Sequence, residues 1–180
     1  FLATGTTIQA LALTLNILPA DFFLDHDTLR KNILSDIERE IEQTHSDWVN
    51  EVPNYVQTVN KLSNQWVVPA SGMVIGSVCL GKERQSGIYN YGLCQLTNTL
   101  DSVGSDGSMS EGYGYGLSYV TTTLLLTKRT IDSVNDPQWS SYGCFTNMSI
   151  WAAMCFQPNS NVVNSFDWYN GQRGYGVDSM

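Results

Sequence analysis

Two carboxylates and three tyrosines between residues 106 and 119 are the side chains of this chain best suited to chemistry. Asp106 and Glu111 could act as the acid and base of a hydrolase, and a tyrosine can act as a base when its pKa falls well below about 10. Each nearby glycine lowers helix stability by roughly 1 kcal/mol relative to alanine. Their presence therefore favours a segment that leaves space for a ligand. The alternative is a loop whose rings fill a core. The three tyrosines are Tyr113, Tyr115 and Tyr119, at the head of an expected helix that follows a turn at Asp106-Gly107-Ser108.

The composition predicts one folded domain over residues 1–180, because hydrophobic residues make up 42% of the chain and charged residues only 14%. The formal net charge is −8. Nine acidic and three basic residues lie within 21–51, so most of the acidity is expected on one solvated face near the N-terminus. The chain has no basic stripe, which argues against nucleic acid as a partner.

Several features favour an extracellular or secreted protein, among them few lysines and many tyrosines and tryptophans. Asn147-Met148-Ser149 is a glycosylation sequon and predicts a glycan on Asn147. The four cysteines could form two disulfides or stay as buried free thiols, and their spacing does not fit a zinc site, so we expect neither a metal nor a cofactor. The most apolar window, 67–80, is too short to span a membrane. Because the chain begins at Phe1, we expect a processed protein or a piece of a longer one.

The spacing of apolar residues predicts helices and almost no strands. Pro53 is expected to start a short segment, and Pro69 to lie in the first turn of the following helix. Both histidines are expected to be structural, His26 in a cap region and His45 near a helix C-terminus. Short connections favour antiparallel hairpins. The expected helices are 6–16, 28–43, 53–62, 69–80, 87–100, 115–128 and 142–156.

Two motifs in this order resemble the α/α-toroid domain of the heparinase II/III, alginate and chondroitin lyase group. Asn64-Gln65-Trp66 enters a helix of small residues, and Asp106 begins an Asp-Gly-Ser-x-x-Glu-Gly-x-x-Tyr segment that ends at Tyr115. The resemblance covers about residues 6–167. It implies an all-α fold in which antiparallel helical hairpins form an incomplete α/α toroid. It also implies a polysaccharide lyase-like function, β-elimination on a uronic-acid-containing polysaccharide.

The resemblance also implies roles for the motif residues. Asn64 would neutralise the uronate carboxylate, because the carbanion formed in the elimination needs hydrogen-bond donors aimed at that charge. Gln65 is the alternative residue for this role. Tyr115 would be the base, with Tyr113 and Tyr119 as close rivals. Glu111 would position a sugar hydroxyl or support the tyrosine, and Trp66 would offer a flat face to a sugar ring. The alternatives are that Asn64 caps the helix that follows, that Trp66 belongs to the core, and that Glu111 interacts with the helix dipole.

A second function is an inactive toroid that binds glycans or acts as a structural extracellular assembly module. Three departures from the lyase pattern favour it: Gln65 follows Asn64 with no histidine near either motif, the second β-sheet domain is absent from these residues, and the chain is acidic. The missing domain suggests a companion domain or self-association. A local basic patch could still attract a polyanion. Its members would be Lys82, Arg84, Lys128, Arg129 and Arg173.

Overall fold

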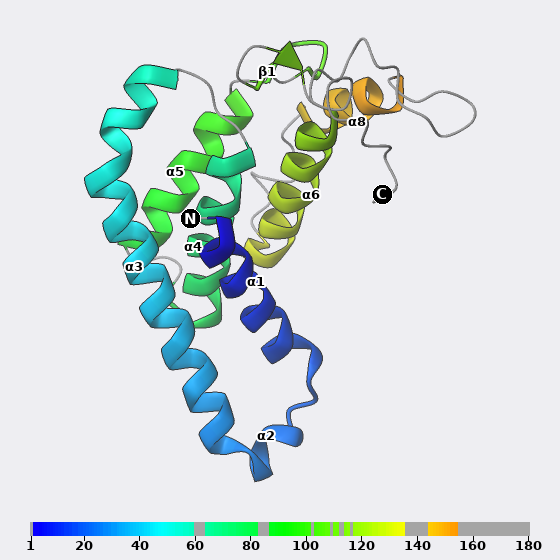
Figure 1. Ribbon diagram of the computed structural model, residues 1–180. Helices are drawn as coiled ribbons and strands as arrows, with labels where there is room; N and C mark the ends of the chain where they lie inside the picture. Colours follow the sequence, from blue (N-terminus) through cyan, green and yellow to red (C-terminus); the bar gives the residue numbers. More distant parts are fainter. Residues whose placement is uncertain are drawn as a thin grey trace.

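The computed structural model is helical, as the sequence predicts, and the all-α fold class is confirmed (Figure 1). It describes residues 2–59, 64–82, 87–101, 103–108, 110–111, 114–115, 117–135 and 144–154, with side chains in 4–50, 67–82, 87–101, 103–108, 124–135 and 144–154. Seven helices lie in this part of the chain, together with one hairpin of two-residue strands. They are α1 (Leu2–Ile17), α2 (Phe22–Asp25), α3 (Asp27–Val59), α4 (Asn64–Cys79), α5 (Gly87–Asp101), β1 (Ser110–Glu111), β2 (Gly114–Tyr115), α6 (Leu117–Val134) and α8 (Cys144–Met154).

Helix α4 is the centre of the core. Every residue from 67 to 77 is buried, including Ser71 and Ser77. The helix contacts α1, α3, α5 and α6, which together surround it. A helix that is apolar all round can be stable only when other elements cover each of its faces, and this arrangement explains why the most apolar window of the sequence lies here.

Helix α1 runs parallel to α4 at close range. A Cβ atom added to Gly5 would lie 2.6 Å from the carbonyl oxygen of Val68, and one added to Gly72 would lie 3.0 Å from the Cα of Gly5. Further along both helices, Ile8 reaches Gly76. Only glycine leaves room for two backbones to approach in this way, so the small residues of α1 and α4 set the distance between the helices.

Helices α3 and α5 run antiparallel to α4. Trp48 packs in one cluster with Val67, whereas Ile37 and Ile41, which come earlier in α3, lie against Gly76. In Figure 1, α1, α4 and α6 run away from the end of the molecule that carries β1, and α3 and α5 run toward it. Successive long helices therefore alternate in direction, and the consecutive pairs α1–α3, α3–α4 and α4–α5 pack as antiparallel neighbours.

Two predicted helix boundaries at prolines are wrong. Helix α3 continues through Pro53 to Val59, and α4 begins at Asn64, so that Pro69 lies inside the helix. A proline inside a helix removes one backbone hydrogen bond and costs about 3 kcal/mol. Around Pro69 the buried face of α4 offsets this cost, because its neighbours Val68 and Ala70 are both buried in the core.

The histidines and cysteines lie only partly where the sequence predicts. His26 is the C-cap of α2, as expected, but His45 lies in the middle of α3, where its ring packs edge-on against Tyr91 at 5.0 Å. Cys79, Cys94 and Cys144 are free thiols, which rules out the two-disulfide alternative because that alternative needs all four cysteines. Cys94 is exposed, so the expectation of buried thiols is wrong for that residue.

Candidate functional site

The turn predicted at Asp106-Gly107-Ser108 is present and is closed by local hydrogen bonds. Asp106 Oδ1 accepts from the Ser108 backbone N–H at 3.0 Å and from the Ser108 hydroxyl at 2.7 Å. Gly107 N donates to the carbonyl oxygen of Gly104 at 2.8 Å, and Gly104 N donates to that of Ser108 at 2.9 Å. An aspartate that accepts from the backbone two residues ahead mimics a backbone turn, so Asp106 shapes the loop that leads to the hairpin.

Helix α8 holds this turn in place. Asn147 Nδ2 donates to the carbonyl oxygen of Ser105 at 3.0 Å, across 42 positions of sequence. The next residue, Met148, is fully buried and packs against Val103 at the start of the turn. Asn147, which the sequence predicts only as a glycosylation site, therefore also has a structural contact.

The hydrogen bonds of the turn lower the pKa of Asp106. The largest cause is the bond from the Ser108 hydroxyl, followed by the bond from the Ser108 backbone N–H. Both bonds favour the ionised carboxylate. A general acid needs the opposite shift, so that it still carries a proton near neutral pH. The hydrolase alternative therefore loses Asp106 as its acid.

Ser108→Ala is expected to raise the pKa of Asp106 toward its ordinary value near 3.9, because the hydroxyl donor is lost. In the native chain the bond stabilises the turn at all pH values above that ordinary value, and the stabilisation is lost as the pH falls through the lowered pKa of the folded state. The measurement is a carbon-detected NMR titration of the Asp106 carboxyl group. Ser105→Ala is the matched control, because Ser105 is exposed and its backbone carbonyl, which the substitution keeps, accepts from Asn147; equal pKa values in the two variants would contradict the prediction.

The second half of the motif lies in the hairpin and not at the head of a helix. Glu111 is in β1 and pairs with Gly114 in β2, and Ser110 pairs with Tyr115. Helix α6 begins only at Leu117, so the expectation that Tyr115 starts the helix is wrong. Tyr119 lies in the first turn of α6, and Tyr113 lies outside the described residues. The side chains of Glu111, Tyr115 and Tyr119 are likewise outside the described part.

The two motif halves lie toward the same end of the molecule. Asn64, Gln65 and Trp66 form the first turn of α4, although their side chains are outside the described residues. Figure 1 shows the end of α5, the β1 hairpin and the start of α6 at this end, the end from which α4 also starts. The alternating direction of the helices thus places at one end of the molecule the segment 64–66 and the described part of the segment 106–115, which are far apart in sequence (Figure 1).

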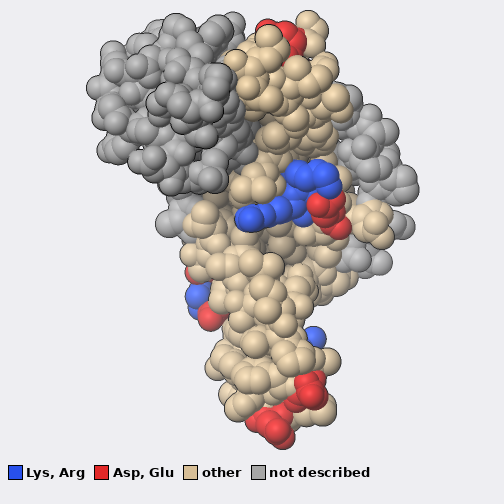
Figure 2. All heavy atoms as spheres, turned by 90° about the vertical axis from the view of Figure 1, so that its right-hand side faces the viewer, with Lys and Arg blue, Asp and Glu red and all other residues tan. Residues whose placement is uncertain are grey.

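The expected basic patch is only partly visible among the described side chains, and its lysines are already paired. Lys82 at the end of α4 pairs with Glu38 of α3, and Lys128 of α6 pairs with Asp132 one turn later. Figure 2 shows Lys and Arg atoms gathered over one face with Asp and Glu atoms directly beside them. Arg84 and Arg173 lie outside the described residues. Pairing within the chain reduces the positive potential available to a polyanion.

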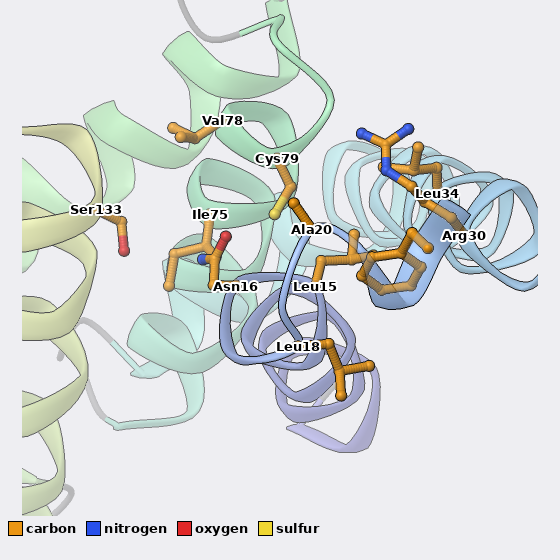
Figure 3. Close-up of a pocket in the computed structure, with 11 residues that line it drawn as sticks. Leu15, Asn16, Leu18, Ala20, Arg30, Leu34, Ile75, Val78, Cys79 and Ser133 are labelled. Carbon is orange, nitrogen blue, oxygen red and sulfur yellow. The ribbon is translucent and has the colours of Figure 1, made fainter. Parts of the chain in front are cut away.

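A pocket of about 520 Å³ lies near the other end of α4, and the sequence analysis did not predict it. Seven apolar side chains from α1, α2, α3, α4 and the α1–α2 connection line it, with four polar ones: Asn16, Arg30, Cys79 and Ser133 (Figure 3). No single motif carries this site, because the lining residues come from six separate segments, with Ser133 supplied by α6. Only the tertiary packing of these segments creates it.

Neither a family model, nor a curated protein, nor a solved structure matches this chain. Within the described residues, no three His, Cys, Asp or Glu side chains are grouped to hold a metal ion. The helices of that same part of the chain also lack the combination of length and apolar character needed to cross a membrane.

Proposed function

We propose that this chain is a polysaccharide lyase-like domain that acts on a uronic-acid-containing polysaccharide by β-elimination. The observation that carries the proposal is the position of the two motif halves, Asn64-Gln65-Trp66 and the segment from Asp106 to Tyr115, toward one end of the helices. The ordered turn at Asp106 adds support, because it fixes the direction in which the chain enters the hairpin of Glu111 and Tyr115.

The arrangement of the helices supports an incomplete α/α toroid. Helices α1, α4 and α6 run in one direction, with α1 and α6 both packed on α4, and α3 and α5 return in the other direction. A toroid repeats such a hairpin around an axis, with one set of parallel helices lining the inside. Here α4 is covered on all its faces, so the toroid proposal rests on the alternating helix directions alone. In this proposal, a companion domain or a second copy of the chain completes the cleft.

The proposed reaction divides its work between two residues. Tyr115, as the phenolate, takes the proton from the carbon next to the uronate carboxylate, and a carbon–carbon double bond forms as the bond to the glycosidic oxygen breaks on the neighbouring carbon. The leaving oxygen takes up a proton from water. Asn64 donates hydrogen bonds to the carboxylate, where negative charge develops in the transition state. Gln65, Trp66 and Glu111 bind the sugar, and Tyr113 and Tyr119 are the alternative bases.

Incubation with a panel of uronate polysaccharides is expected to produce the ultraviolet absorbance of an unsaturated uronate. Tyr115→Phe is expected to lower the rate by about 10²–10⁴-fold, the usual contribution of a general base, and Asn64→Ala by about 10²–10³-fold. Tyr91→Phe is the matched control, because Tyr91 packs on His45 and Trp48 in the core. Folded protein that gives no absorbance change with any of these polysaccharides would refute the lyase proposal.

An inactive, glycan-binding or structural module is the second candidate, and one observation favours it. The net charge is −8, and Lys82 and Lys128 are both paired within the chain, so attraction to a polyanion is weak. Retention of the folded protein on an immobilised glycan that it does not cleave would support this candidate. An extracellular location and a glycan on Asn147 belong to both proposals. Asn147 Nδ2 carries two hydrogens and donates one to Ser105, so a glycan would replace the other.

A further inference from the structure

Arg30 differs from most of the other cations that the structure describes. Lys31, Arg39, Lys82 and Lys128 each pair with a carboxylate of the chain. Within the described residues no carboxylate lies at ion-pair distance from Arg30, although it belongs to the most acidic segment of the sequence. The carboxylate of Asp27, in the same turn of α3, pairs with Lys31 and not with Arg30.

Arg30 lies at an exposed position of α3, and seven of the eleven residues that line its pocket are apolar. The pocket has a volume of about 520 Å³, and Leu15, Leu34 and Ile75 are among its other lining residues. A volume in this range suits a small organic ligand, since ligand pockets usually measure about 300–1,000 Å³. An apolar wall with one charged group provides both burial for a hydrocarbon chain and a fixed partner for its polar end.

The shape of the pocket indicates how such a ligand would lie. Figure 3 shows the lining side chains spread from Ser133 on α6, past Ile75 and Asn16, to Leu34 and Arg30 on α3. Arg30 therefore lies at one edge of the lining, on the side opposite Ser133 (Figure 3). A guanidinium binds a carboxylate through two parallel hydrogen bonds, which also fixes its orientation.

We infer that this pocket binds an amphipathic anion, an unbranched hydrocarbon chain that ends in a carboxylate, with the carboxylate on Arg30 and the chain along the apolar wall. The site is separate from the proposed lyase site, because it involves the end of α4 at Ile75, Val78 and Cys79, whereas Asn64 starts that helix. Acidic residues close by in sequence, Asp21 and Asp25, oppose the binding of an anion. Burial of the ligand's hydrocarbon chain therefore supplies most of the binding affinity, and Arg30 supplies the preference for a ligand that ends in a carboxylate.

Titration calorimetry with octanoate, decanoate and decanol tests this inference. Decanoate is expected to bind about fifteenfold more tightly than octanoate, because each buried methylene adds about fourfold. Arg30→Ala is expected to weaken decanoate binding tenfold or more and to leave decanol binding within about twofold. The matched control is Arg129→Ala, which removes the same charge from an exposed position of α6 that does not line this pocket. Equal losses in the two variants, or no decanoate binding, would overturn the inference.

A second measurement needs no substitution. Cys79 lines the pocket as a half-buried free thiol, and burial raises its pKa, whereas Cys94 is an exposed free thiol that does not line the pocket. Decanoate is expected to slow the alkylation of Cys79 and to leave that of Cys94 unchanged, as followed by mass spectrometry of the two peptides. If decanoate slowed the alkylation of both thiols equally, or of neither, the result would show that decanoate does not occupy this pocket. The result is independent of whether the protein cleaves polysaccharides.

Discussion

Trp48→Ala is expected to lower the free energy of unfolding by about 4 kcal/mol, a value typical of removing a buried tryptophan side chain. Trp48 is 1% exposed and is the largest fully buried side chain among those described. It connects three helices, because it lies on α3 and packs in one cluster with Val67 of α4 and Leu96 of α5. Its ring also meets that of Tyr91 edge-on at 6.3 Å. The cavity left by this substitution would therefore open where α3 and α5 pack against α4.

Urea denaturation followed by circular dichroism measures this change. Val49→Ala is the control, since Val49 is the next residue of the same helix and is 42% exposed; substitutions at such positions usually change stability by less than about 0.5 kcal/mol. Trp48→Phe is expected to fall between the two, because it retains part of the buried ring. A loss for Trp48→Ala within about 1 kcal/mol of that for Val49→Ala would show that this cluster does not hold the helices together.

The Trp48 cavity has a second consequence that a general loss of stability does not share. Burial raises the pKa of Tyr91, and the charge of the Cys94 thiolate adds to the effect. With Trp48 removed, water reaches the Tyr91 ring, and its pKa is expected to fall toward the ordinary value near 10. An NMR titration of labelled tyrosine rings at temperatures well below unfolding would report this shift.

The positions of the helices were largely predictable from the sequence, because each apolar face has a regular spacing. In α3, Ile33, Ile37 and Ile41 recur every four residues, and all three are buried. Helix α5 was predicted to within one residue at its end, since Gly87–Asp101 matches the expected 87–100. Periodicity reports which face of a segment is buried, and this information is local.

The errors arose where distant contacts decide the outcome. Local rules predict helix boundaries at Pro53 and Pro69, but both residues lie inside helices. The contact between Asn147 and Ser105 and the pocket around Arg30 each join segments far apart in sequence, so no local spacing could predict them. The turn at Asp106 was predictable because an aspartate followed by glycine and serine closes a turn with its own neighbours.

Gly107 in this turn is the position where adding a single methyl group is expected to disturb the candidate site most. Gly107 has a φ of +87°, a conformation that residues with a Cβ atom rarely adopt. A Cβ atom there would also lie 2.1 Å from the carbonyl oxygen of Asn147 and 2.5 Å from the nitrogen of Met148. These are backbone atoms of α8 and cannot rotate away. Gly107→Ala must therefore move the turn or the helix.

Gly107→Ala is expected to cost about 3 kcal/mol, since backbone strain contributes about 1–2 kcal/mol and overpacking a similar amount. Urea denaturation gives the total, and the NMR signals of the Asn147 side-chain amide report whether its bond to Ser105 breaks. The control is Gly87→Ala, where an added Cβ meets no atom within 4 Å and little change is expected. If the Gly107→Ala variant had the same stability and the same Asn147 signals as the native chain, the result would show that α8 does not hold the turn in place. If both are lost, the hairpin of Glu111 and Tyr115 loses its support, and any lyase activity is expected to fall with it.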